Sequence, residues 1–271
     1  MKYGIIAGNG RFPVLALETA RKQGDEAVAI AIKEEAGPEV ERVAAKCHWI
    51  SLGELSRLID ICHAEGITKI MMAGQVKHAK IFSSIRPDWK LVKVLASLGS
   101  KNTDSLIGAV QKVLLDEGIE LVDSTLLLKP LLAAKGVLTK RKPDSDEQRD
   151  ITYGSRIANQ LASLDLGQSV AISDKACVAL EAMEGTDAML RRAASLVEGK
   201  RLTLVKSSSR RRHLLFDVPV IGPGTVETMV ETGTTALAVD AGRTLLLDRE
   251  ELLEKANAAK LAIIAMEPEE A

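Results

Sequence analysis

Acidic side chains in the second half of the chain are spaced in a way that suits metal-assisted chemistry on phosphates. Glu184 and Asp187 fall in the run ALEAMEGTDAMLRRA (179–193), where a strand-like segment leads through Gly185 and Thr186 into a helical pattern. Two carboxylates on one such turn could hold a divalent cation or a sugar hydroxyl. Capping of the following helix by Thr186 or Asp187 is the simpler interpretation, but it accounts for only one residue of the run.

A third acid, Asp217, stands just before Val218-Pro219 and between two apolar runs. Because a proline restricts the residue that precedes it, the acid is expected in a rigid turn. Such an acid suits a Mg²⁺ ligand or a general base, and a strand-ending turn is the alternative. Upstream, Lys206 and Arg210–Arg212 form a basic stretch that either contacts a phosphate or is a solvated loop.

A glycine loop, Gly8-Asn9-Gly10, follows the first strand-like run. Its glycines would let the backbone approach a ligand, and the helix that follows would offer free N–H groups to an anion. A dinucleotide fingerprint needs a third glycine at position 13, where Pro13 stands. Three interpretations therefore stay open: a tight turn without a ligand, a site for an anionic group, and a dinucleotide site.

The fourth strand-like run ends in MMAGQVKHAK (71–80), so Gln75 and Lys77 would emerge at its carboxyl end. Ligands of open α/β sheets bind at this end of the strands, which makes both residues candidates for substrate binding. A solvated loop is the alternative. The motifs of serine hydrolases, zinc proteases and P-loop NTPases do not occur, so these three classes are disfavoured.

The apolar pattern predicts the elements that position these side chains. Strand-like runs cover 3–7, 27–32, 47–51, 69–74 and 119–123, with helical patterns between them. Short, nearly all-apolar strands that alternate with amphipathic helices favour a parallel sheet covered on both faces. We predict an α/β protein whose residues 1–128 form a Rossmann-like, doubly wound parallel sheet.

Prolines and a charged run in residues 129–150 predict a linker. Residues 151–271 then combine strands and helices less regularly. Strands are expected at 169–173, 177–183, 202–206, 235–240, 244–248 and 261–266, and helices at 153–164, 186–197, 224–233 and 249–259. The first two of these strands are close enough for a hairpin, which predicts a C-terminal α/β domain with a mixed sheet. Because the candidate residues are spread over both domains, we expect a cleft between the two.

Composition narrows the possible partners and the location. Aromatic residues make up 3% of the 271 residues and the net charge is -1, so we expect no nucleic-acid binding. The three cysteines form no CxxC pair, which indicates free thiols in a reducing compartment. The longest apolar runs are far shorter than the ~20 residues of a membrane span. We expect a cytoplasmic protein.

Six segments of the chain occur in the order found in the LpxI-type UDP-2,3-diacylglucosamine pyrophosphatases of lipid A biosynthesis, which this sequence resembles over nearly its whole length. The segments are GIIAGNGRFPVLALETARKQG, MMAGQVKHAKIF, LVDSTLLLKPLLAAKGVLT, DITYGSRIANQLASLDLGQSVAI, LEAMEGTDAMLRRAASL and FDVPVIGPGTVETMVETG. The resemblance implies Mg²⁺-dependent hydrolysis of UDP-2,3-diacylglucosamine to lipid X (2,3-diacylglucosamine 1-phosphate) and UMP, with attack of water on the sugar-side phosphorus. It also implies a homodimer that can contact the inner membrane peripherally.

With the resemblance, the candidate residues receive expected roles. The family's essential aspartate aligns with Asp217. The catalytic candidates are Asp217, Asp187 and Lys206; the substrate-binding candidates are Gly8, Asn9, Gly10, Gln75, Lys77, Gly185 and Thr186; the metal candidates are Asp217, Glu184 and Asp187. The chain departs from the family just before FDVP, where it reads Arg212-His213-Leu214-Leu215 in place of a Gln-Asp-x-Arg-like stretch. The alternatives are a nicotinamide-dependent oxidoreductase and a non-catalytic protein that binds acylated sugar phosphates.

Overall fold

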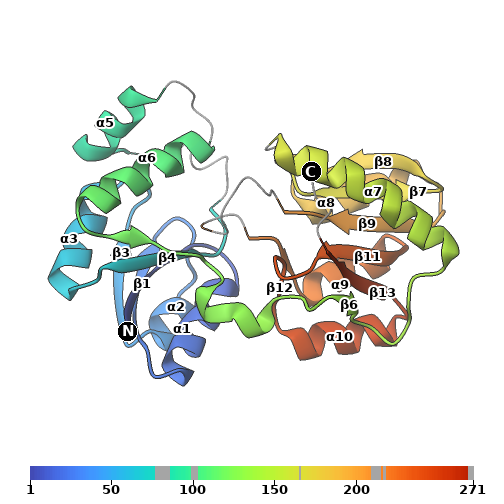
Figure 1. The fold of residues 1–271 in the computed structure, drawn as a ribbon, viewed down its shortest axis with the longest axis horizontal. Helices are drawn as coiled ribbons and strands as arrows, with labels where there is room; N and C mark the ends of the chain where they lie inside the picture. Colours follow the sequence, from blue (N-terminus) through green and yellow to red (C-terminus); the bar gives the residue numbers. More distant parts are fainter. Residues whose placement is uncertain (77–85, 99–102, 165, 209–214, 216–217, 268–271) are drawn as a thin grey trace. The chain divides into compact units, whose positions relative to one another are not determined.

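The chain divides into two compact units, Met1–Leu128 and Lys129–Ala271, in this computed structural model (Figure 1). The structure describes residues 1–76, 86–98, 103–164, 166–208, 215 and 218–267, without the side chains of Thr103 and Asp104. Each unit has its own β-sheet and its own buried core. The chain is thus a mixed α/β protein with a parallel sheet in the first unit and a mixed sheet in the second, as the sequence predicts.

The first unit is built around a five-stranded parallel sheet in the order β3-β2-β1-β4-β5. Its strands are β1 (Lys2–Ala7), β2 (Glu26–Ile32), β3 (Lys46–Ile50), β4 (Lys69–Ala73) and β5 (Glu120–Leu121). The central strands are nearly continuous apolar runs because helices cover both faces of the sheet. Ile5, Ile30 and Met71 are completely buried in this core.

The helices of the first unit form two groups. They are α1 (Phe12–Lys22), α2 (Glu39–Val43), α3 (Leu55–Glu65), α5 (Trp89–Ser97) and α6 (Thr103–Asp116). Helix α1 packs on α2, while α3 packs on α5 and α5 on α6, and the two groups lie on opposite faces of the sheet (Figure 1). The chain adds strands outward from β1 to β3 on one side and then from β4 to β5 on the other, so the strand order switches between the parallel neighbours β1 and β4. Their carboxyl ends lie side by side, and this place is called the switch point below.

The second unit contains a six-stranded mixed sheet in the order β6-β13-β11-β9-β7-β8. Its strands are β6 (Gly136–Val137), β7 (Ser169–Ser173), β8 (Ala176–Leu180), β9 (Leu202–Lys206), β11 (Thr234–Asp240) and β13 (Ala262–Met266). Strands β9, β11 and β13 are parallel, and β7 and β8 form the predicted antiparallel hairpin beside β9. The ends of β8, β9 and β11 and the start of β7 therefore share one edge of the sheet. A separate parallel pair joins β10 (Val220–Ile221) and β12 (Leu245–Leu246).

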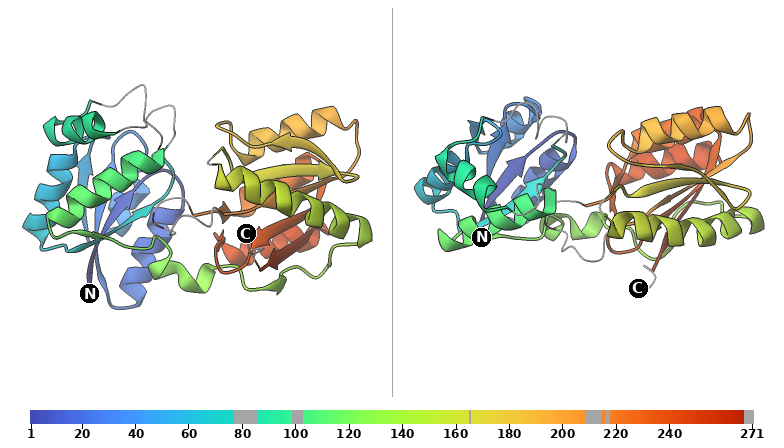
Figure 2. Two further views of the ribbon diagram at one scale, coloured as in Figure 1. Left: turned by 45° about the horizontal axis from the view of Figure 1, so that its top comes forward. Right: turned by 90° about the horizontal axis from the view of Figure 1, so that it is seen from above.

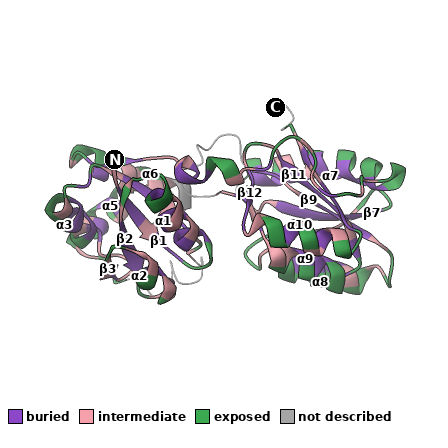
Figure 3. Ribbon diagram, turned by 90° about the horizontal axis from the view of Figure 1, so that it is seen from below, coloured by how far each residue is buried: buried purple, intermediate pink, exposed green. Residues whose placement is uncertain are grey.

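Helices cover both faces of the second sheet. Helix α7 (Ser145–Ser163) lies on one face, and α8 (Thr186–Leu196), α9 (Pro223–Glu231) and α10 (Arg249–Ala258) lie on the other (Figure 2). The larger core lies under α8–α10 and includes Met189, Leu204 and Leu237, all completely buried. Burial follows the sheet strands and the inward faces of the helices (Figure 3). In α8, for example, the buried residues Met189, Leu190 and Ala193 follow the helical spacing of its apolar positions.

Residues 129–150, for which the sequence suggests a linker, belong to the second unit. They complete the short 3₁₀ helix η1 (Leu126–Leu131), form β6 against β13, and begin α7. Asp144 caps α7 in a capping box with Glu147. The charged run that resembles a linker is therefore used in capping and ion pairing.

Within the described residues, no helix combines the length and the apolar composition needed to cross a membrane.

Candidate functional site

The glycine loop and the end of β4 meet at the switch point of the first sheet. The Gly8 N–H donates to the Ala73 carbonyl oxygen at 2.8 Å, and Asn9 and Gln75 exchange backbone hydrogen bonds of 2.8 and 3.0 Å. Asn9, Gly10 and Gln75 are exposed beside the start of α1. The fold thus makes neighbours of four predicted substrate-binding residues: the exposed Asn9, Gly10 and Gln75, and the buried Gly8. Lys77 lies outside the described residues.

Two of the glycines have a structural reason to be glycine. A Cβ on Gly8 would lie 2.7 Å from the Gln75 carbonyl oxygen, and a Cβ on Gly74 would lie 2.5 Å from that of Asn9. Both glycines therefore allow the two strand ends to approach each other. Gly10 has a positive φ of 94° with open space where a Cβ would be. Pro13 occupies the first turn of α1, where a missing N–H costs nothing.

In the second unit, three polar side chains meet at the Thr186 hydroxyl. Lys206 Nζ lies 3.1 Å from Thr186 Oγ1, Glu181 Oε1 lies 2.9 Å from it, and Ser169 Oγ lies 3.2 Å from it. Lys206 ends β9, Ser169 opens β7, Glu181 follows β8, and Thr186 opens α8. The fold thus brings predicted residues Thr186 and Lys206 into direct contact, although 20 positions separate them in the sequence.

The helix N-cap predicted for Thr186 or Asp187 is wrong. The N-cap of α8 is Gly185, which has a positive φ of 84° and no side chain to accept a bond. The Thr186 hydroxyl instead belongs to the cluster with Lys206, Glu181 and Ser169. Tertiary contacts therefore replace the local capping bond that the sequence suggests.

The acids on the turn before α8 differ in their surroundings. Glu184 Oε1 accepts from Arg192 Nη2 at 2.7 Å, and Glu184 Oε2 accepts from the Ala182 N–H at 3.1 Å. The bond from Arg192 lowers the pKa of Glu184. Asp187 is exposed in the first turn of α8 and accepts no hydrogen bond from the described residues. In the described part of the chain, no three His, Cys, Asp or Glu side chains gather as a metal site would require.

Sequence reasoning missed several polar residues at the same edge. Asp240, at the end of β11, is 6% exposed and accepts from the backbone N–H and the hydroxyl of Ser208 at 2.7 and 3.1 Å. Arg243 Nε donates to that hydroxyl at 2.7 Å. The sequence did offer one signal for Asp240, Ser208 and Arg243: each lies at or just after the end of a parallel strand, where ligands of such sheets bind. Asp217, the expected catalytic acid, lies outside the described residues.

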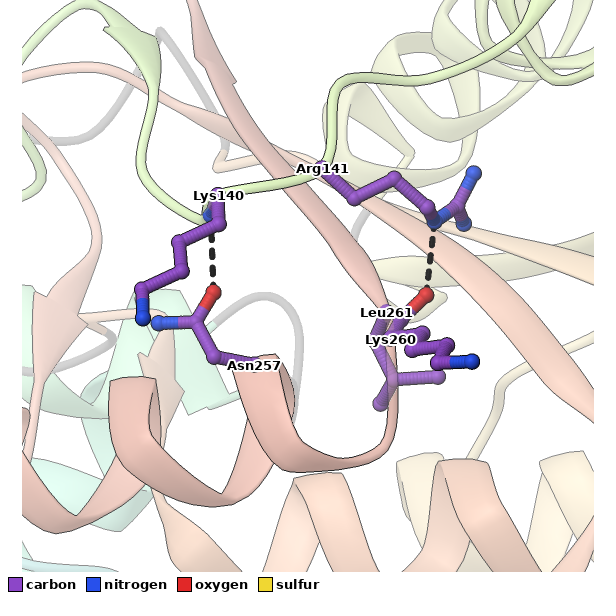
Figure 4. Close-up of a pocket in the computed structure, with 5 residues that line it drawn as sticks. All are labelled: Lys140, Arg141, Asn257, Lys260 and Leu261. Atoms are coloured by element: carbon purple, nitrogen blue, oxygen red, sulfur yellow. Dashed lines mark hydrogen bonds between the residues drawn. The ribbon is translucent and has the colours of Figure 1, made fainter.

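A separate pocket of about 310 Å³ lies at the opposite end of the second sheet (Figure 4). Lys140, Arg141, Asn257, Lys260 and Leu261 line it. The Lys140 N–H donates to Asn257 Oδ1 at 2.7 Å, and Arg141 Nε donates to the Lys260 carbonyl oxygen at 2.6 Å. These bonds tie the segment before α7 to the end of α10. The pocket is therefore not part of the edge that holds Lys206 and Thr186.

Comparisons with known proteins agree with the arrangement of two units. The family of LpxI N-terminal domains matches residues 2–131, and the family of LpxI C-terminal domains matches residues 134–264. A protein of Caulobacter vibrioides called "UDP-2,3-diacylglucosamine pyrophosphatase LpxI" is 30% identical over 99% of both chains.

Solved structures resemble the chain only remotely. CobK precorrin-6A reductase has a TM-score of 0.34 and 14% identity, and the match covers 100% of this chain and 89% of the reductase. A pyruvate carboxylase of Rhizobium etli has a TM-score of 0.29 and 11% identity, and the match covers 72% of this chain and 15% of the carboxylase. The family matches are far more specific, and on their strength the chain belongs to the LpxI family.

Proposed function

We propose that this chain hydrolyses the pyrophosphate bond of UDP-2,3-diacylglucosamine in a Mg²⁺-dependent reaction of lipid A biosynthesis, and that the products are lipid X and UMP. The observation that carries this proposal is the match to an LpxI pyrophosphatase across 99% of both chains. Water would form a bond to the sugar-side phosphorus, the bond from that phosphorus to the bridging oxygen would break, and UMP would leave with that oxygen.

Among the residues that the structure describes, Lys206 is the cationic side chain best placed to act on a phosphate. It ends a parallel strand, where ligands of such sheets bind, and no carboxylate among the described residues forms an ion pair with it. A fixed ammonium group beside a phosphate stabilises the negative charge that grows in the transition state. We assign Lys206 to this role and Asp217 to orienting the attacking water. Asp187 is the third catalytic candidate.

The first unit would contribute contacts to the polar part of the substrate through Gly8, Asn9, Gly10 and Gln75, with Lys77 following Gln75 in the sequence. The strand order β3-β2-β1-β4-β5 supports a Rossmann-like domain, in which ligands lie at the switch point between β1 and β4. A nicotinamide cofactor is less well supported for two reasons. Pro13 stands where the fingerprint needs its third glycine, and the space beside Gly8 is filled by the Gln75 backbone.

Magnesium would be held by few protein ligands. Mg²⁺ commonly binds one or two carboxylates together with substrate phosphates and waters, so a cluster of three acids is not required. Of the described candidates, exposed Asp187 fits this role better than Glu184, whose oxygens are engaged by Arg192 and a backbone N–H. We propose Asp187 and Asp217 as ligands, with Glu184 as the weaker candidate. The bound ion would neutralise charge on the anhydride oxygens.

The proposal extends to where and how the protein works. We propose a cytoplasmic homodimer that meets its lipid substrate by peripheral contact with the inner membrane and does not bind nucleic acid. A non-catalytic protein that binds acylated sugar phosphates is the remaining alternative, and it would bind lipid X without Mg²⁺-dependent turnover.

Variants test the assigned roles. We expect Asp217→Ala to lower turnover of UDP-2,3-diacylglucosamine by several orders of magnitude and Lys206→Ala by about 10²- to 10³-fold. Asp116→Ala and Lys142→Ala are matched controls, because both residues are exposed and form no hydrogen bond or ion pair with the described residues through their side chains. Circular dichroism would check that each variant is folded. Near-normal turnover in Asp217→Ala would remove this acid from the reaction.

A further inference from the structure

The directions of the hydrogen bonds at Thr186 follow from the chemistry of its neighbours. Lys206 can only donate, so Thr186 Oγ1 accepts from it at 3.1 Å. An ionised Glu181 can only accept, so the Thr186 hydroxyl donates to Glu181 Oε1 at 2.9 Å. The one proton of Thr186 is then used, which makes Ser169 the donor in the contact of 3.2 Å.

Thr186 therefore has no bonding capacity left for a ligand. Its one proton and both acceptor positions are used inside the cluster. Lys206, in contrast, uses one of its three donors in the described structure. Glu181 uses one oxygen, while its Oε2 is buried and has no hydrogen-bond partner among the described residues. The hydrogen-bonding capacity that the cluster leaves unused is thus on the Lys206 ammonium group and on Glu181 Oε2.

The unpartnered oxygen of Glu181 needs an explanation, because a buried acceptor without a donor is costly. The backbone of Glu181 is held in place, because its N–H donates to the Ser169 carbonyl oxygen at 2.9 Å. Gly167 also lies so close that a Cβ there would clash with the Glu181 carbonyl oxygen. The residue as a whole is half-buried, so rotation about its side-chain bonds can present Oε2 to a bound molecule.

We propose that Lys206 and Glu181, joined by Thr186, form a subsite for a sugar phosphate. Lys206 binds a phosphate oxygen, and Glu181 Oε2 accepts a hydrogen bond from a hydroxyl or amide N–H of the sugar. This inference rests on the proposed function and identifies the cluster with the sugar half of the substrate. Thr186 is a positioning residue, since its saturated hydroxyl links the two groups that contact the ligand.

The size of the cluster agrees with such a ligand. Because the two bonds of 3.1 and 2.9 Å share Thr186 Oγ1, Lys206 Nζ and Glu181 Oε1 lie no farther apart than the sum of these lengths. Neighbouring phosphate and hydroxyl groups of one sugar phosphate are separated by a comparable span. A divalent cation is a poorer occupant, because the ammonium group of Lys206 repels it over this distance.

Apolar side chains beside the cluster suit an acylated sugar. Leu180 precedes Glu181 and Met183 follows it closely, and they are 43% and 72% exposed. Leu166 is 58% exposed and precedes Gly167, whose backbone lies against Glu181. These exposed side chains would lose contact with water when acyl chains bind, which favours binding at about 0.8 kcal/mol per buried CH₂.

Ligand-detected NMR on the full chain tests this subsite with three probes: inorganic phosphate, glucosamine 1-phosphate and UMP. We expect Glu181→Ala to weaken glucosamine 1-phosphate roughly 10- to 100-fold, as loss of a hydrogen bond to a charged group should. Binding of inorganic phosphate and of UMP should change less than about twofold. Lys206→Ala should weaken both inorganic phosphate and glucosamine 1-phosphate.

Further variants separate ligand contact from a structural role. Glu181→Gln keeps the size of the side chain but places an amide donor beside the ligand's donor, so it should weaken glucosamine 1-phosphate as Glu181→Ala does. Thr186→Ser should retain binding and Thr186→Val should lose it. Glu254→Ala is the control, because Glu254 is an exposed acid on α10 whose side chain forms no hydrogen bond or ion pair with the described residues.

Three results would overturn the inference: no binding of glucosamine 1-phosphate to the unchanged protein, equal losses for all three probes in Glu181→Ala, or a loss confined to UMP. The test is independent of turnover. If the binding pattern holds and UDP-2,3-diacylglucosamine is not hydrolysed, only the proposed function fails. If hydrolysis occurs and Glu181→Ala binds glucosamine 1-phosphate normally, only the subsite fails.

Discussion

Asn9 and Gln75 exchange two backbone hydrogen bonds, of 2.8 and 3.0 Å, and thereby join the ends of β1 and β4. The pairing is an isolated antiparallel bridge that lies just beyond the parallel strands β1 and β4. It holds the exposed side chains of both residues at the switch point. The glycines beside them, Gly8 and Gly74, make this close approach possible.

Gly74→Ala should destabilise the first unit. Gly74 has a positive φ of 87°, and a Cβ there would lie 2.5 Å from the Asn9 carbonyl oxygen. Backbone strain and the clash together should cost about 2–4 kcal/mol of unfolding free energy. Urea unfolding measures the loss. Gly24→Ala is the matched control, because Gly24 also has a positive φ, of 77°, but open space around it. Equal losses in the two variants would contradict the close approach.

Glu147→Gln should destabilise the second unit by about 2–4 kcal/mol. Glu147 is 1% exposed, and its oxygens accept from Arg141 at 2.7 and 2.8 Å and from the Thr235 hydroxyl at 2.6 Å. The amide cannot accept all of these bonds, so Arg141 loses its counter-charge. Chemical unfolding at neutral pH measures the loss, and the exposed Glu254→Gln should leave stability unchanged.

The same ion pair predicts a pH dependence. Burial alone would raise the pKa of Glu147, but the bonds from Arg141 and Thr235 outweigh it and lower the pKa below 4.5. Since the folded value is the lower one, the stabilisation is fully present above about pH 4.5 and is lost as pH falls through the folded pKa. The stability difference between the unchanged protein and Glu147→Gln should therefore shrink on acidification. A constant difference down to about pH 3 would contradict the ion pair.

The three cysteines should react slowly with iodoacetamide in the folded protein. Burial raises the pKa of Cys62 to about 11, and burial with the nearby Glu41 carboxylate raises that of Cys47 to about 11. Burial also raises the pKa of Cys177. Because the thiolate is the reactive form, little of it is present at about pH 8. Mass spectrometry should find three free thiols after denaturation, and rapid labelling of native Cys62 would contradict its burial.

The two acids before and within α8 should differ in their effect on metal activation. Asp187→Asn should raise the Mg²⁺ concentration needed for half-maximal turnover roughly tenfold or more. Glu184→Gln should change it less than about twofold, because both Glu184 oxygens already accept hydrogen bonds. Asp116→Asn serves as the control. A larger effect of Glu184→Gln than of Asp187→Asn would contradict this assignment and show that the ion pair of Glu184 with Arg192 opens when the metal binds.

Much of the fold could be predicted from the sequence, because nearly all-apolar strands and amphipathic helices that end in glycine have local sequence signals. Strands β1 to β4 and the end of α3 at Gly66 follow from such signals. Strands β6 and β10 could not be predicted, since each is two residues long and exists through its partner strand. The charged segment 129–150 suggests a linker because its hydrogen-bond partners, such as Thr235, lie far away in sequence.

The candidate site was only partly predictable. Thr186 and Lys206 could be singled out by residue type and position, but their contact depends on how α8 packs beside β9. Glu181 was missed because the predicted strand 177–183 included it, whereas β8 ends at Leu180. Hydrogen bonds between distant segments, such as that of Ser169 with Thr186, have no local pattern that would reveal them.

The most direct test of the proposed function is hydrolysis of UDP-2,3-diacylglucosamine by the full chain in ¹⁸O-labelled water, with Mg²⁺ and with EDTA. Mass spectrometry would follow both products. We predict UMP and lipid X in the Mg²⁺ reaction alone, with the label in the phosphate of lipid X. Absence of both products while lipid X still binds would contradict the enzymatic proposal and favour a non-catalytic binding protein.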